Sequence, residues 1–189
     1  MARVPYISRD DLPADKRPLY DHIEQTRGGI DGNGMPNSFR LLLNSPDGAE
    51  AVGALGEHIR LRSSLHPAFR ETAILGVARA LDSQYVWAHH EPIARSVGVR
   101  DEVIESIRSG RAPMGLPPKE GVFAQAGKEF VRNGALGERT FQAVEHLLGP
   151  EGAVELVVVI GYYTMLNAVL GSLGIELDAH LEATLPVQS

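Results

Sequence analysis

The sequence predicts an all-α fold, a compact bundle of several helices. Apolar residues recur at helical spacing, as Phe69, Ala73, Val77 and Ala80 do within one segment. No region alternates polar and apolar residues between turn signals, so no sheet is expected. Hydrophobic residues make up 43% and charged residues 22% of the 189 residues, which is the balance of one folded domain.

Start and stop signals divide the chain into helices. The expected helices occupy residues 12–27, 38–43, 46–63, 67–81, 83–97, 102–109, 119–133, 138–148 and 151–172. Asn37 and Asp101 are the expected N-caps of their helices, because such side chains accept from free backbone N–H groups. Pro67 suits a first helical turn, and Gly98 suits a helix end. The Gly149-Pro150 pair separates the last two helices.

Composition excludes several classes of function. The net charge is −6 and no long basic run occurs, which disfavours nucleic acid and anionic membranes as partners. No cysteine is present, so disulfides, thiolate zinc sites, iron–sulfur clusters and cysteine nucleophiles are excluded. Residues 1–20 show no apolar signal core, and we expect a cytoplasmic protein. The glycine-rich loop at 28–36 lacks the flanking pattern of a phosphate-binding loop.

The stretch 156–175 carries no charge and is long enough to span a bilayer. However, it contains Asn167, its flanks are acidic, and no Lys or Arg follows Arg139, whereas membrane spans usually have a basic flank. A helix buried in a core or between subunits is the favoured interpretation. Because one 20 kDa domain would struggle to cover this stretch, we expect a homo-oligomer and no membrane span.

Glu71 is the first candidate for proton chemistry. It lies in the first turn of a helix, on the same face as Ile74, Leu75 and Ala78. Withdrawal from water would raise its pKa, whereas the dipole at the helix N-terminus favours the anion. A surface carboxylate at a helix start is the simpler alternative.

Two adjacent histidines are the second candidate, and helix geometry separates them. Successive side chains point about 100° apart, so His90 shares the apolar stripe of Val86 and Ile93, while His89 lies nearer Tyr85. His90 is therefore the inward histidine. It is either a hydrogen-bonded core residue or, if the two helices fold back on each other, the partner of Glu71 in proton transfer.

A metal site receives little support. His89, His90 and Glu91 are consecutive and fan around a helix, so they cannot chelate one ion together, and no His-Glu-x-x-His pair occurs. We predict no metal and no cofactor, because no flavin or haem signature is visible. Arg60 or Arg62 is a candidate ligand for a substrate carboxylate, with a solvated helix charge as the alternative.

These residues together resemble a known family. Glu71, the run SQYVWAHH at 83–90 and the Ile-Ala-Arg that follows at 93–95 are similar to the core of the carboxymuconolactone decarboxylase and alkyl hydroperoxidase D superfamily. The flanking motifs MPNSFR at 35–40 and LHPAFRE at 65–71 extend the resemblance. It covers roughly residues 35–176. The resemblance implies an all-α bundle, obligate oligomers (often trimers or hexamers) and an active site near subunit interfaces. For this chain we expect a trimer, dimer or hexamer.

The chain departs from the peroxidase branch of that family at the decisive positions. That branch has a Cys-x-x-Cys pair between the Glu and the His, and here the pair falls on Ser83 and Val86. Neither residue supplies a thiolate, so thiol peroxidase chemistry cannot carry over. Glu71 and His90 match the family's Glu and His.

The sequence therefore predicts a small-molecule enzyme with acid/base chemistry, a lyase or isomerase of a small lactone or enol acid. Glu71 and His90 are the predicted catalytic residues. The predicted substrate-binding residues are Ser83, Tyr85, Trp87, His89 and Arg60. Two alternatives stay open: a catalytically silent oligomer that binds a ligand or partner, and a peroxidase-like enzyme without cysteine.

The predicted domain organisation follows the extent of the resemblance. Residues 1–34 form an N-terminal extension with a helix and the glycine-rich loop. Residues 35–176 form the family domain, and residues 177–189 form a C-terminal tail.

Overall fold

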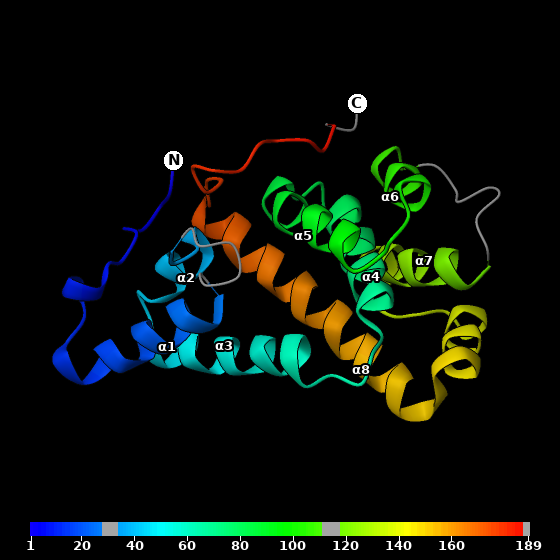
Figure 1. The fold of residues 1–189 in the computed structure, drawn as a ribbon, viewed down its shortest axis with the longest axis horizontal. Helices are drawn as coiled ribbons and strands as arrows, with labels where there is room; N and C mark the ends of the chain where they lie inside the picture. The colour runs from blue at the N-terminus through cyan, green and yellow to red at the C-terminus, as the bar shows by residue number, and fades with distance from the viewer. Residues whose placement is uncertain (28–33, 111–117, 187–189) are drawn as a thin grey trace. The chain divides into compact units, whose positions relative to one another are not determined.

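The computed structural model describes residues 1–27, 34–110 and 118–186, and the helices follow the chain in the order shown in Figure 1. Two short 3-10 helices come first, η1 (Arg9–Asp11) and η2 (Ala14–Lys16). The α-helices are α1 (Arg17–Arg27), α2 (Asn37–Leu42), α3 (Pro46–Leu61), α4 (Pro67–Ala80), α5 (Gln84–Ser96), α6 (Asp101–Arg108), α7 (Pro118–Asn133) and α8 (Glu138–Leu173). Helices make up 73% of the structure, and no strand occurs in the described ranges. The predicted all-α fold is confirmed.

The chain divides into two compact units. Unit 1 comprises Met1–Ser63 and Ala168–Leu181, and unit 2 comprises Ser64–Asn167 and Glu182–Ser189. The predicted family domain at 35–176 follows sequence resemblance and stays a prediction. Most of the predicted glycine-rich loop lies outside the described residues.

Unit 1 has a core of its own beneath α1, α2 and α3. Buried members of this core are Leu12, Tyr20, Ile23, Met35, Phe39, Leu43 and Ala49. The start of α2 corrects one predicted cap. Asn37 is the first helical residue after the N-cap Pro36, and its backbone N–H donates to Asp178 Oδ1 at 2.8 Å. The carboxylate that satisfies this free N–H group thus comes from a residue far along the chain.

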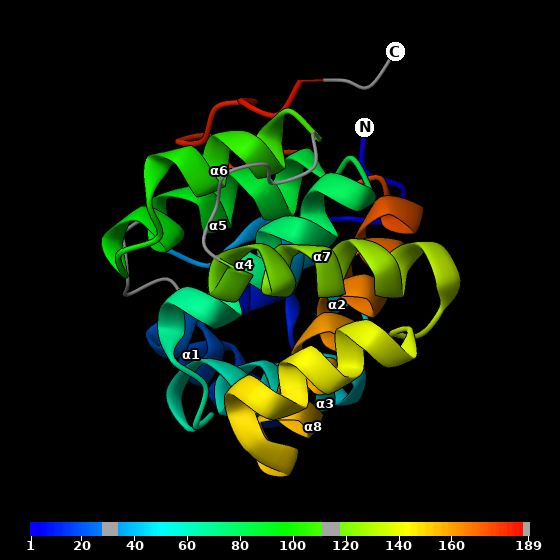
Figure 2. The ribbon, with the colours of Figure 1, turned by 90° about the vertical axis from the view of Figure 1, so that its right-hand side faces the viewer.

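Unit 2 is built around α4. Every residue of α4 from Arg70 to Arg79 is buried, and α5, α6 and α7 all pack against this helix. Figure 2 shows α7 lying along α4. The two helices meet at Gly76 and Gly127: a Cβ added at Gly76 would lie 2.5 Å from the Ala124 carbonyl oxygen. Any side chain here would force the helices apart, so glycine permits their close contact.

The ends of α5 and α6 follow local chemistry. Ser83 is the N-cap of α5, and its Oγ accepts from the Val86 N–H at 3.3 Å. Gly98 follows α5 with a positive φ of 90°, as expected for a helix end. The predicted N-cap Asp101 is wrong by one residue: Arg100 is the N-cap, and Asp101 begins α6 and pairs with Arg95. An acidic residue in a first turn is favoured by the helix dipole.

The last helix, α8, is interrupted where the sequence indicates. Gly149 has φ 71° and ψ 174°, which is not helical, and Pro150 follows it. This break lies between the two predicted helices, 138–148 and 151–172. By length and composition alone α8 could cross a membrane, although 39% of its most apolar window is buried within the protein. Core helices of soluble proteins meet the same criterion, so the absence of a membrane span stays a prediction.

Candidate active site: a Glu–His pair in unit 2

Glu71 of α4 and His90 of α5 contact each other directly. His90 Nδ1 lies 2.7 Å from Glu71 Oε2, and the side chains are 12% and 2% exposed. The short connection after α4 turns the chain back, so that α5 packs against α4. The predicted contact between these two residues is confirmed. The predicted catalytic role of the pair is taken up below as a proposal.

Arg70 is a third member of the site. Its Nε donates to Glu71 Oε1 at 3.2 Å, and its side chain is almost as buried as that of Glu71. Each oxygen of the carboxylate therefore has its own nitrogen partner. Sequence reasoning missed Arg70, because neighbouring helical residues point in different directions and give no sign of contact.

Burial and neighbouring charges shift the pKa of Glu71 in opposite directions. Burial alone would raise the pKa of this carboxyl group. Attraction to His90 and the hydrogen bond from it, together with the charge and hydrogen bond of Arg70, outweigh burial and lower the pKa below its ordinary value. Glu71 is therefore a buried anion whose contact with Nδ1 orients the imidazole ring of His90.

Tyr163 of α8 packs against the imidazole ring of His90. Its ring meets that of His90 edge-on, with centroids 4.8 Å apart and an interplanar angle of 85°. Tyr162 in turn contacts Tyr163 edge-on at 5.1 Å. Since Glu71 holds Nδ1, the neutral ring carries its proton there and leaves Nε2 as the atom that accepts or donates a proton. Sequence reasoning assigned no role to Tyr163.

His89 occupies a different environment from His90. It is half-buried, and its ring lies 4.6 Å from that of Tyr85, one turn earlier in α5. The helical phasing predicted from the sequence, with His90 toward Glu71, is confirmed. The substrate-binding roles of Tyr85 and His89 stay predictions.

Two other predicted substrate-binding residues have structural partners. Ser83 caps α5, as described above, and its hydroxyl hydrogen is still available for donation. Trp87 is completely buried, and its Nε1–H donates to Glu91 Oε2 at 2.8 Å. The predicted substrate-binding roles of Ser83 and Trp87 stay predictions.

Glu91 is the centre of a network that the sequence did not reveal. Its Oε2 accepts from Trp87 and, at 2.9 Å, from the Thr184 hydroxyl. Its Oε1 accepts from Arg95 at 3.0 Å and from Arg108. Burial raises the pKa of Glu91, but these hydrogen bonds and the charge of Arg108 lower it overall. The network fastens the C-terminal segment to α5 and α6.

Arg60 lies in unit 1, where its Nη2 donates to the Thr26 carbonyl oxygen. Its predicted contact with a substrate carboxylate therefore stays a prediction. Across the described ranges, no three His, Asp or Glu side chains are grouped to hold a metal ion.

Residues 46–129 match the Carboxymuconolactone decarboxylase family, and this range contains both Glu71 and His90. This match and the solved structures described below support the superfamily predicted from the sequence, that of carboxymuconolactone decarboxylase and alkyl hydroperoxidase D-like proteins. The chain has no cysteine. No curated protein sequence matches the chain.

Solved structures share the fold over nearly the whole chain. An uncharacterized peroxidase-related protein with an alkylhydroperoxidase AhpD core, from Ralstonia eutropha JMP134, is 20% identical with a TM-score of 0.77, covering 94% of this chain and 93% of that one. The debrominase Bmp8 in complex with 2,3,4-tribromopyrrole is 18% identical with a TM-score of 0.70, covering 95% of each chain. A peroxidase-related protein from Silicibacter sp. TM1040 is 17% identical with a TM-score of 0.72, covering 94% and 91%. At these identities the likeness establishes the fold alone.

Proposed function

We propose that this superfamily member is a thiol-independent acid/base enzyme, a lyase or isomerase acting on a small lactone or enol acid. The observation that carries the proposal is the 2.7 Å contact between His90 Nδ1 and Glu71 Oε2. A buried carboxylate beside an imidazole is a standard arrangement for proton transfer. We further propose a cytoplasmic homo-oligomer that binds neither nucleic acid nor membranes.

In a decarboxylation, the two residues have distinct roles. The substrate C–CO₂ bond breaks, carbon dioxide leaves, and the electron pair remains on the substrate as an enolate. The His90 imidazolium then gives its Nε2 proton to the enolate carbon and becomes neutral. Glu71 stays ionised and stabilises the imidazolium before the transfer. Hydroxyl groups of Ser83 and Tyr85 are the proposed donors to the developing enolate oxygen.

The solved relatives are consistent with a site for small organic molecules. One of them is a debrominase crystallised with a substituted pyrrole, and others are peroxidase-related. The chemistry differs among them, so the substrate class proposed here depends on the proton pair and the absence of cysteine.

The test is a screen of small carboxylated lactones and enol acids with the purified protein in D₂O, followed by proton NMR. We expect one class to lose carbon dioxide or isomerise, with deuterium at the carbon that received the proton. His146→Ala, a change of an exposed histidine in α8, should leave turnover intact. If no compound in the panel turns over above a heat-inactivated control, the proposed function is wrong.

A silent binding oligomer is the second candidate, and one observation favours it. The His90 side chain is only 12% exposed, and the Tyr163 ring lies against it. In this case a panel compound would bind without being converted. Equilibrium binding and turnover, measured on the same compounds, separate the two candidates.

A further inference from the structure

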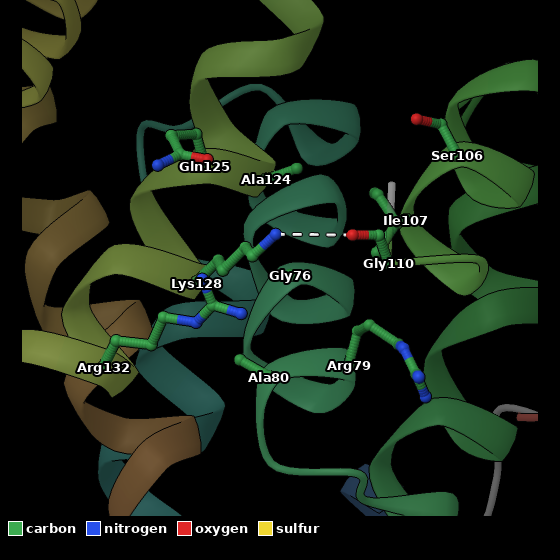
Figure 3. A pocket seen from close by; sticks show the side chains of 10 residues that line it. All are labelled: Gly76, Arg79, Ala80, Ser106, Ile107, Gly110, Ala124, Gln125, Lys128 and Arg132. Carbon is green, nitrogen blue, oxygen red and sulfur yellow. Dashed lines mark hydrogen bonds between the residues drawn. The ribbon is translucent and has the colours of Figure 1, made fainter. Parts of the chain in front are cut away.

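A small pocket lies in unit 2, between α4, the end of α6 and α7. The described residues that line it are Gly76, Arg79, Ala80, Ser106, Ile107, Gly110, Ala124, Gln125, Lys128 and Arg132. Figure 3 shows Lys128 and Arg132 extending from α7 over α4, with Arg79 on the far side. Neither Glu71 nor His90 belongs to this lining.

The described charged residues that line the pocket are all positive. Among the described lining residues, three are cationic and none is acidic. This contrasts with the whole chain, whose net charge is −6. Three like charges around one small space repel one another unless an anion lies between them.

The partners of the three cations differ. Arg79 is buried and is held by Asp82 Oδ1 at 2.9 Å and by the Pro186 carbonyl oxygen at 2.8 Å. Lys128 donates to the Gly110 carbonyl oxygen at 3.4 Å, which is long for a hydrogen bond. Among the described residues, neither Lys128 nor Arg132 forms an ion pair. Two of the three charges therefore have no anionic partner in this part of the protein.

The small volume of the pocket limits the size of a ligand that it can hold. The cavity measures about 60 Å³, which is room for a few waters or for one small oxyanion group. Two of the lining residues, Gly76 and Ala124, lie at the close contact between α4 and α7. Ser106 and Gln125 add a hydroxyl and an amide, both able to donate to an oxyanion.

We propose that this pocket binds the oxyanion group of a small molecule, a phosphate or a carboxylate. Lys128 and Arg132 supply the charge, and Arg79 forms the buried wall. The site is distinct from the proton pair. Arg79 follows Glu71 by eight residues on α4, which is about 12 Å along a helix axis, too far for one small anion to reach both.

Titration calorimetry of the full-length protein tests this proposal, with inorganic phosphate, acetate and chloride compared at constant ionic strength. We expect saturable binding of phosphate or acetate, and the tighter of the two identifies the oxyanion. Lys128→Gln and Arg132→Gln should each weaken that binding about tenfold. Arg139→Gln, which removes an exposed arginine outside the pocket, is the matched control and should bind like the wild type.

Two results would overturn the proposal. One is a heat signal that does not saturate or that chloride reproduces at the same ionic strength. The other is unchanged binding in both Lys128→Gln and Arg132→Gln, with thermal unfolding showing that both variants are folded. Because His90→Ala leaves the pocket untouched, it should still bind the anion, so the outcome is independent of the proposed enzyme activity.

Discussion

At the scale of single residues, Glu71 is a buried charge that depends on its partners. Its carboxylate is 2% exposed and relies on His90 and Arg70 to remain ionised. A buried charge that loses its partners is strongly destabilising, so the three side chains form one electrostatic unit. Removal of His90 or Arg70 takes away an interaction that keeps Glu71 ionised.

The pH dependence of stability follows from the lowered pKa of Glu71. A carboxyl whose pKa is lower in the folded state stabilises the protein above its ordinary pKa, here 4.5, and loses this contribution as pH falls through the folded value. At pH 7, Glu71→Gln should reduce the free energy of unfolding by about 3 kcal/mol. Urea unfolding at several pH values should show the gap to the wild type closing below pH 4.5.

The matched control for that experiment is Glu145→Gln, at an exposed position of α8. It should change stability little at any pH. A gap between wild type and Glu71→Gln that stays constant into acid would show that Glu71 is not an ionised partner of His90.

A second prediction at the residue scale concerns peroxidase activity and depends on Ser83 and Val86. By the resemblance noted in the sequence, they correspond to the cysteine pair of the peroxidase branch, and in the structure Ser83 caps α5 while Val86 is buried. Neither can form the disulfide that stores electrons during hydroperoxide reduction. Hydroperoxide consumption coupled to thioredoxin-like or lipoyl donors should therefore equal that of a heat-killed sample. Thiol-dependent turnover well above that level would refute the prediction.

The sequence could predict only part of the site. Glu71 and His90 follow from helical phasing, because each lies on the apolar face of its helix. Arg70 and Tyr163 could not be found in this way: one is adjacent to Glu71 in the chain, and the other comes from α8, many residues later. Contacts that depend on tertiary packing leave no periodic signal in the sequence.

Among the elements, the crossing of α4 and α7 depends on two glycines. A Cβ at Gly127 would lie 2.5 Å from the Ala73 carbonyl oxygen and 2.9 Å from the Val77 nitrogen. Backbone atoms cannot yield as a flexible side chain can, so Gly127→Ala should cost about 1–3 kcal/mol. The measurement is the free energy of unfolding from urea titration.

A glycine in an open position provides the control. At Gly161 of α8, an added Cβ meets only Phe130 Cζ at 3.9 Å, an ordinary contact. Gly161→Ala should be neutral or stabilise the helix by roughly 0.5–1 kcal/mol. Equal effects of the two substitutions would mean that the α4–α7 crossing is looser than described.

The helices themselves were largely predictable, whereas two of their caps were not. The break at Gly149 and the ends at Pro67 and Gly98 follow from local backbone chemistry. The predicted cap Asn37 was wrong because Asp178, 141 residues away, satisfies the first free N–H group. The cap predicted at Asp101 lies one residue earlier, at Arg100, since an acidic residue suits the first turn of a helix as well as its cap.

At the scale of the whole molecule, the surface of α8 predicts assembly. Val154, Val158 and Met165 of α8 lie on one helical face and are 61%, 41% and 41% exposed. Exposed apolar side chains at this spacing favour contact with a second copy of the chain. Light scattering should show a stable oligomer at micromolar concentration, and Val158→Glu should shift it toward the monomer.

Gln142→Glu is the control, because it adds the same charge at an exposed position of the same helix. It should leave the assembly unchanged. A wild-type protein that is monomeric at micromolar concentration would exclude the predicted oligomer.

The proton pair is tested most directly by comparing turnover in two adjacent histidine variants. On a substrate found in the screen, His90→Ala should lose about 100-fold or more of kcat, because the proton donor and acceptor is gone, while circular dichroism shows the fold intact. His89→Ala, whose ring contacts Tyr85 rather than Glu71, should keep a large part of the activity. Full activity in His90→Ala, or its loss in His89→Ala alone, would contradict the assignment of His90 and Glu71 as the catalytic pair.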